Sequence, residues 1–272
     1  MTPAAPSPPG ATLRALAVIG RGPLGFGREL ARVARLGCAA VLALRRVEPR
    51  EAVRQLFELG NRSLLFVAVV LGFTGAILVI QASLQAQRII GDVSLVGPTF
   101  LQLLVREFGP TIVAMMVAAR YGAGVAAELG AMQVTEQVDA LRMAGEEPAA
   151  FLVAPRLLAG LVGTPALAVL GSLAAFAAGG LAAYHGFGVS RASYFRLTLV
   201  TAPDVVVGLC KALCCGFAIP LVASHAGLSA RGGAAGVGRA TTRAVIGASL
   251  AVLAVDLVVG SLAQLWLGPS AR

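Results

Sequence analysis

The chain has 272 residues, of which 57% are hydrophobic and only 13% charged, and its mean hydropathy is +0.83. About a quarter of the residues in a soluble protein are charged, so this composition excludes an ordinary soluble domain and predicts a membrane protein. The net charge of +9 comes mainly from arginine and is accompanied by only 6% aromatic residues. Without a nucleic-acid-binding motif, this pattern argues against a nucleic-acid partner.

The first 62 residues differ from the rest of the chain. Residues 1–11 (MTPAAPSPPGA) lack the basic and then apolar order of a signal peptide, and they predict a disordered tail. The run Leu30–Leu44 is about fifteen residues long and contains two arginines, so it is short for a span and indicates an interfacial elbow helix. A sixth span is the alternative. We therefore expect residues 1–62 to form a tail with elbow and connecting helices, followed by a membrane domain over residues 63–268.

Five later blocks are long and apolar enough to cross a bilayer, which takes about 20 helical residues. Barrel strands would instead give alternating segments of about ten residues, so an all-α polytopic fold with five transmembrane helices is expected. The blocks are Leu64–Leu84, a span within Val96–Leu129, Leu157–Tyr184, Val205–Ser224 and Ala244–Leu267. The second block would measure about 51 Å as a straight helix. It must therefore break near Gly109-Pro110 or project from the membrane.

The arginines predict the orientation of the chain. Ten arginines and four glutamates precede the first span, and three arginines without an acidic residue lie between the fourth and fifth spans. Five spans place both segments on one side of the membrane, which the positive-inside rule identifies as the cytoplasm. The N-terminus is then cytoplasmic, and the C-terminus lies on the outer side.

Charged residues inside the spans are candidate functional residues, because burial in lipid is costly unless they pair or face a cavity. Lys211 lies in the fourth span, Asp256 in the fifth, and Arg106 and Glu107 in the second. Counting helical rise from the outer face places Glu107 near the surface, Lys211 about 9 Å below it and Asp256 about 16 Å below it. A polar-lined substrate cavity and a structural Lys–Asp pair remain as compatible interpretations.

The sequence contains no catalytic motif, such as HExxH, a nucleophile elbow or a Walker A loop. We therefore expect no enzymatic activity, no cofactor and no metal site, and any ATP hydrolysis would take place on another chain. Small residues recur every fourth position at Gly122, Ala126 and Gly130, which permits close helix packing but is a weak dimerisation signal in an Ala-rich chain.

The segment between the second and third spans contains a predicted amphipathic helix over about residues 134–145. Thr135 is its expected cap, Glu136 lies in its first turn and Gly145 ends it. Its apolar face consists of Val134, Val138 and Leu141, and its charged face consists of Glu136, Asp139 and Arg142. An inert connector is the alternative. A connector needs only a few residues, and the anionic inner leaflet would repel the acidic face, so a protein partner is favoured.

The order of motifs resembles the MlaE/YrbE family of permeases. The motifs are REFGP, AARYGAG, AELGAMQVTEQVDAL and APR, followed by GRATTRAV and SLAVLAVD near the fifth span, and the similarity covers about Arg50 to Leu267. Members of this family are permease subunits of ABC transporters that work with MCE proteins.

The resemblance implies a homodimer, or a heterodimer of two such permeases, in the bacterial inner membrane. Its partners would be a cytoplasmic ATPase, a periplasmic MCE-domain protein and a small cytoplasmic STAS-type regulator, and phospholipid or related lipids would be the cargo. The segment from Glu136 to Ala144 would be the coupling helix that docks on the ATPase, with Asp139, Leu141, Arg142 and Gly145 within or beside it. Glu107, Lys211 and Asp256 match charged positions in the outward-facing lipid pathway of the family.

Two other functional classes are compatible with the residues themselves. An ion- or proton-coupled secondary transporter could use Lys211 and Asp256 as a relay, although such folds usually contain inverted repeats and none is found here. A membrane anchor without transport activity is the other class. It would tolerate neutralisation of both residues without loss of function.

Overall fold

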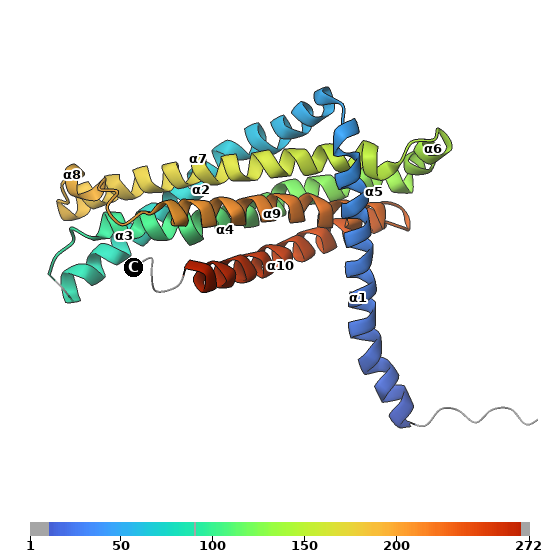
Figure 1. The fold of residues 1–272 in the computed structure, drawn as a ribbon, viewed down its shortest axis with the longest axis horizontal. Helices are drawn as coiled ribbons and strands as arrows, with labels where there is room; N and C mark the ends of the chain where they lie inside the picture. The colour runs from blue at the N-terminus through green and yellow to red at the C-terminus, as the bar shows by residue number, and fades with distance from the viewer. Residues whose placement is uncertain (1–10, 90, 268–272) are drawn as a thin grey trace, which may run out of the picture.

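The computed structural model describes residues 11–89 and 91–267, so the first ten residues of the predicted disordered tail lie outside the described part. All regular elements in the described residues are helical (Figure 1). They are α1 (Ala11–Ala43), η1 (Leu44–Arg46), α2 (Pro49–Ile89), α3 (Val96–Leu103), η2 (Leu104–Phe108), α4 (Gly109–Val117), η3 (Ala118–Gly122), α5 (Ala123–Val134), α6 (Gln137–Met143), η4 (Ala149–Val153), α7 (Ala154–Phe187), α8 (Arg191–Tyr194), α9 (Ala202–Leu228) and α10 (Gly233–Leu267).

Five helical runs in the described residues are long and apolar enough to cross a membrane, which confirms the predicted all-α fold with five spans. They are α2, α3 to α5, η4 with α7, α9 and α10. Four of the five begin earlier than the predicted apolar block, because helical hydrogen bonding continues into the flanking sequence, and the second begins at Val96 as predicted. At 41 residues, α2 is about 60 Å long and must project beyond the bilayer. Helix α2 also runs without a break across residues 62 and 63, where the boundary between the N-terminal part and the membrane domain was expected.

The second span is one continuous helical run of 39 residues from Val96 to Val134. Pro110 has no N–H with which to bond the carbonyl of Arg106, and here the backbone widens into the π-helical turn η2 without breaking. A second π-helical turn, η3, follows α4. Of the two expected outcomes, a break or a projection, the structure therefore has the projection.

The N-terminal helix α1 crosses the bundle at a steep angle near the end that carries α6 (Figure 1). Its C-terminal half packs on η4, α7 and α9, with Ala40 and Ala43 buried against Leu157 and Leu221. The helix is not among the candidate spans in the described residues, so the sixth-span alternative finds no support.

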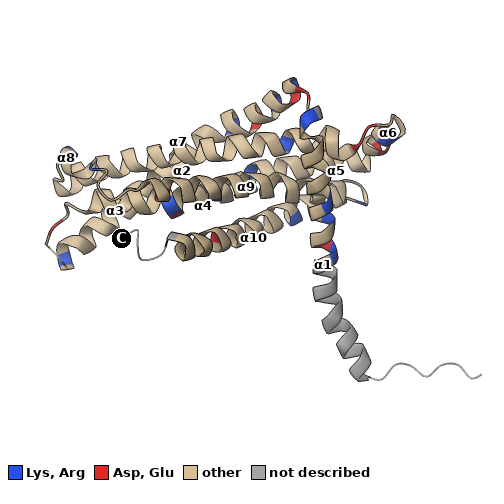
Figure 2. Ribbon diagram, viewed as in Figure 1, with Lys and Arg blue, Asp and Glu red and all other residues tan. Residues whose placement is uncertain are grey.

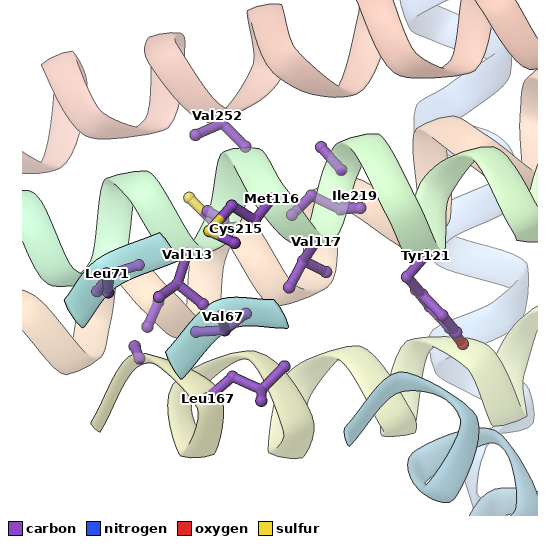
Figure 3. Packing of buried hydrophobic residues seen from close by; sticks show 14 of the residues in the cluster. Val67, Leu71, Val113, Met116, Val117, Tyr121, Leu167, Cys215, Ile219 and Val252 are labelled. Carbon is purple, nitrogen blue, oxygen red and sulfur yellow. The ribbon is translucent and has the colours of Figure 1, made fainter. Parts of the chain in front are cut away.

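The core of the bundle is a cluster of small and branched aliphatic side chains between α2, α4, α7, α9 and α10. Figure 3 shows Val113 and Met116 of α4 directed into the same space as Val67, Leu167 and Cys215. Helices α2 and α7 pack along much of their length, and α9 lies between α7 and α10. Charged residues gather towards the ends of the bundle, with few along its middle (Figure 2).

Glycines permit the closest helix contacts. A Cβ atom on Gly75 would overlap the backbone of Ala175 in α7, and one on Gly160 of α7 would overlap the carbonyl oxygen of Gly216 in α9. These contacts bring helix backbones together in the way that small residues allow in membrane proteins. The α2–α7 and α7–α9 pairs are therefore sterically fixed at these positions.

Candidate functional site

A buried lysine joins two carboxylates from different helices inside the bundle. The ammonium group of Lys211 on α9 forms ion pairs with Glu107 of η2 and with Asp256 of α10, the latter at 2.9 Å. The Lys211 side chain is only 1% exposed, whereas the two carboxylates are about one-third exposed. Removing an ammonium group from water is costly, and two surrounding carboxylates offset that cost. We call these three residues the charge triad.

The charged groups of the triad meet at one level, so the graded depths predicted for them are wrong. Glu107 lies eleven residues from the start of α3, Lys211 nine from the start of α9, and Asp256 eleven from the end of α10. All three positions are therefore about 14 to 17 Å from the same end of the bundle. Asp256 lies at its predicted depth of about 16 Å, whereas Glu107, which was placed near the outer end, is eleven residues into its helical run. Lys211 is deeper than predicted because α9 begins at Ala202 rather than at Val205.

The site continues through Arg106, which is directed to the start of α9. Its guanidinium donates to Asp204 at 3.2 Å, and Gln102 donates to the same carboxylate at 3.3 Å. Asp204 also closes a capping box with Thr201, whose hydroxyl donates to it at 2.8 Å. This network fixes the second span to the N-terminus of α9.

Sequence reasoning missed two contributors to this site. Thr111 donates its hydroxyl to Asp256 at 2.7 Å and lies four residues after Glu107, on the same helix face. Asp204 ends the sequence Thr201-Ala-Pro-Asp204, a capping-box pattern placed directly before an apolar run. Helix spacing and the capping pattern were the two signals that could have identified these residues.

An apolar groove of about 430 Å³ lies between α9 and α10 next to the triad. It is lined by Pro203, Val206, Val207, Cys210, Val259, Leu262, Ala263 and Trp266. Two residues of the groove show how close it is to the triad. Cys210 directly precedes Lys211, and Val259 directly precedes Gly260, where an added Cβ atom would lie 3.4 Å from the Lys211 ammonium nitrogen. A smaller apolar cavity of about 210 Å³ lies on the other side of α9, between α3, α4 and α7. The apolar groove therefore borders the triad, whose exposed charged atoms belong to the carboxylates of Glu107 and Asp256 rather than to Lys211.

The amphipathic segment after the second span forms α6 at the far end of the bundle (Figure 1). Val138 is fully buried and Leu141 half-buried, while Asp139 and Arg142 are exposed and form an ion pair at 2.7 Å. Gly145 adopts a left-handed conformation at φ 82°, and hydrogen bonds from Gly145 and Glu146 to the last turn complete the C-terminal cap. The helix thus presents its charged face to the surroundings.

The predicted N-terminal cap of this helix is wrong. Thr135 closes α5 instead, donating its hydroxyl to the carbonyl of Ala131 at 2.9 Å. Glu136 precedes the first turn of α6 in the left-handed conformation, at φ 61°, and is the one non-glycine residue with positive φ in the described chain. Thr135 and Glu136 form the turn that separates α5 from α6, and the left-handed residue in it costs roughly 1 kcal/mol.

The stripe of Gly122, Ala126 and Gly130 packs inside the protomer. Gly122 faces Ile219 and Ala223 of α9, Gly227 approaches the backbone of Ala126, and Gly130 lies beside Val237 at the start of α10. Close packing within one chain therefore accounts for this spacing of small residues.

The comparisons with known proteins agree with this architecture. The family model described as permease MlaE matches residues 52–262. A probable ABC transporter permease protein of Rickettsia conorii is 35% identical over 212 residues, which cover 77% of this chain and 82% of the relative. The intermembrane phospholipid transport system permease protein MlaE of Haemophilus influenzae is 30% identical over 217 residues, covering 76% of this chain and 80% of the relative.

A plant protein is also similar. The chloroplastic protein TRIGALACTOSYLDIACYLGLYCEROL 1 of Arabidopsis thaliana is 30% identical over 214 residues, which cover 78% of this chain and 61% of the relative. The similarity predicted from the ordered motifs is confirmed over most of the chain. The chain is therefore a multi-pass permease subunit of the MlaE family of ABC transporters.

Proposed function

We propose that the protein moves phospholipid between the inner and outer membranes of a bacterium, driven by ATP hydrolysis on a separate ATPase chain. Family membership and the phospholipid transport role named for the Haemophilus influenzae relative support this function. The single observation that carries it is the position of the charge triad beside the apolar groove between α9 and α10.

The chemistry of the site suits a phospholipid. The acyl chains would lie in the groove that ends at Trp266, and the polar headgroup would meet the partly exposed carboxylate of Asp256, which the buried Lys211 ammonium group holds in place. Arg106 supplies a second cation, held in place by Asp204. A site with both cations and carboxylates can accommodate a phosphate together with the charges of its headgroup.

The charge distribution supports a cytoplasmic position for the α6 end. The loop between α9 and α10 lies at this end and carries Arg231, the first turns of α10 carry Arg239, and the arginine-rich segment before α2 adjoins them. The triad then lies in the outer half of the membrane, and the C-terminus is periplasmic. In this orientation α6 faces the ATPase, where a small regulator of the STAS type would also bind, and the opposite end faces a periplasmic MCE-domain protein.

A second protomer would pack against α10. This helix exposes Leu250, Leu253 and Leu257 along one side, and only a small part of its apolar window is buried within the protomer. The groove between α9 and α10 would then border the dimer interface. ATP binding to the ATPase chain would close the groove between α9 and α10, with α6 transmitting the movement.

Reconstitution tests the proposed energy source. The permease is placed in proteoliposomes with its ATPase and MCE partner, and transfer of a fluorescent phospholipid to acceptor vesicles is measured with ATP, without ATP, and with a pH gradient alone. ATP-dependent transfer is expected. Transfer driven by the pH gradient without ATP would instead support an ion-coupled secondary transporter and contradict the proposal.

A further inference from the structure

A second polar pocket lies towards the α6 end, away from the charge triad. It has a volume of about 260 Å³ and is lined by Gln55, Glu58, Arg62, Arg120, Tyr121, Gly124, Val125 and Glu128. Arg120 follows Glu107 of the triad by thirteen residues in the same helical run, so the two positions are about 20 Å apart along the axis. The pocket is therefore a separate site, between α2 and the second span.

Two arginines in this pocket have no carboxylate partner. Arg120 donates to the Ser63 hydroxyl at 2.5 Å, and within residues 11–89 and 91–267 neither Arg62 nor Arg120 lies within 4.0 Å of a carboxylate oxygen. Glu128 is instead paired with the buried Arg156 at 2.8 Å. Arginine stays charged in proteins, so the pocket presents two positive groups that are available to an anion.

The floor of the pocket is ordered by buried hydrogen bonds. The Tyr121 hydroxyl donates to Gln55 at 3.3 Å, and the Gln55 amide donates to Glu51 at 2.9 Å. Gln55 is 1% and Tyr121 6% exposed. In Figure 3, Tyr121 lies apart from the aliphatic cluster, at the α5 side of the core. A buried and paired network of this kind fixes the wall of the pocket.

The pocket lies at the start of the apolar run of α2, the level at which lipid headgroups would lie. Arg62 and Ser63 directly precede the apolar run of α2, so Arg120, bonded to Ser63, lies at the same level. From Arg62, exposed apolar residues follow on one face of α2 at the fourth, seventh and eleventh positions: Phe66, Val69 and Phe73. The polar pocket therefore continues into an apolar track that runs along the bilayer.

We infer that this pocket binds the phosphate headgroup of a phospholipid from the leaflet on the α6 side. The guanidinium groups of Arg62 and Arg120 bind the phosphate, and the acyl chains lie along Phe66, Val69 and Phe73. The carboxylate of Glu58 faces an ammonium group, so a headgroup with phosphate and a primary amine, such as phosphatidylethanolamine, fits best. The inference rests on the proposed function only in its choice of lipid, and it concerns binding without transport.

Native mass spectrometry of the purified permease complex tests the site. The delipidated complex is titrated with phosphatidylethanolamine or phosphatidylglycerol, and the variants are Arg62→Gln, Arg62→Gln with Arg120→Gln, and Arg88→Gln as a control. Arg88 is an exposed arginine in the last turn of α2, at the opposite end of the bundle. Because Arg62 makes no side-chain hydrogen bond within the described residues, its single variant keeps the test valid if the double variant fails to fold.

Removal of both guanidinium groups is expected to weaken phosphatidylethanolamine binding by about tenfold or more, and Arg62→Gln alone by several-fold. Arg88→Gln is expected to bind as the wild type does, and Glu58→Gln to lose the preference for phosphatidylethanolamine over phosphatidylglycerol. Equal binding by the wild type and Arg62→Gln would contradict the proposed site, because Arg62 would then make no specific contact with the lipid phosphate. If the wild-type complex binds phosphatidylethanolamine at this pocket but shows no ATP-driven transfer, only the proposed function is contradicted.

Discussion

The Lys211 ammonium group lies almost without solvent between Glu107 and Asp256, and Thr111 also contacts Asp256. A buried charge of this kind adds little net stability while it is paired, but removing one partner leaves the others uncompensated. The triad is therefore more sensitive to the loss of its shared lysine than to the loss of either carboxylate.

Replacement of the lysine should have the larger effect. Lys211→Met leaves two carboxylates facing each other and is expected to lower the free energy of unfolding by about 3 kcal/mol, whereas Asp256→Asn should cost less because Glu107 still pairs with the lysine. Thermal unfolding of the purified variants in detergent measures this order. An equal loss of stability in both variants would show that Lys211 does not hold the triad together.

Glycine positions offer a second test at the residue scale. Gly160→Ala places a methyl group against the Gly216 carbonyl and should destabilise the protein by about 1 to 3 kcal/mol. Gly238→Ala, on exposed α10 with no atom within 4 Å of the added carbon, should be neutral or stabilising by up to about 1 kcal/mol. Thermal unfolding distinguishes them, and tolerance of Gly160→Ala would contradict the close α7–α9 contact.

At the scale of elements, the apolar periodicity predicted the helices well but not their ends. Five spans followed from block length alone, whereas the start of α6 depended on a left-handed Glu136 that no local pattern indicates. The spans were also longer than predicted, since polar residues extend α2 and α9 past their apolar blocks. Helix ends depend on hydrogen bonding and tertiary contacts as much as on hydropathy, so an apolar block does not give the first residue of a helix.

The exposed face of α6 is expected to transmit ATP hydrolysis to the membrane helices. Charge reversal at Glu136 or Asp139 should uncouple phospholipid transfer while the bundle stays folded, because neither side chain is buried. ATPase co-purification and ATP-driven transfer provide the measurements. Asp92→Lys, in the loop after α2, is the matched control for ATPase binding and should co-purify with the ATPase as the wild type does. Variants that still bind the ATPase and still drive transfer would show that α6 is not the coupling element.

At the scale of the whole molecule, the sequence predicted the residues of the triad and offered the Lys211–Asp256 pair as one interpretation, but it did not predict that Glu107 joins them. Lys211, Glu107 and Asp256 are more than forty residues apart in the chain, and only helix packing brings them together. The same packing places the stripe of Gly122, Ala126 and Gly130 inside the protomer, so its spacing carries no information about a dimer. The apolar side of α10 is the better candidate for contact with a second protomer.

Cross-linking tests this assignment of the dimer contact. In a variant without the native cysteines, Leu253→Cys on α10 should form a disulfide between two protomers under mild oxidation, whereas Leu181→Cys on the exposed side of α7 should not. Denaturing gel electrophoresis without reductant reveals the dimer. Dimer formation through Leu181→Cys alone would place the second protomer against α7 and contradict the assignment.

Photo-cross-linking at the groove beside the triad tests the central claim most directly. A photoreactive residue replaces Leu262 in the groove or, as a control, Leu181 on α7, and both positions lie near the same end of the bundle. The assembled transporter is irradiated with radiolabelled phospholipid, with and without ATP. Strong labelling at Leu262 that falls when ATP binds, with weaker and nucleotide-independent labelling at Leu181, is the predicted result. Equal labelling at both positions, unaffected by ATP, would contradict an ATP-gated phospholipid pathway at the triad.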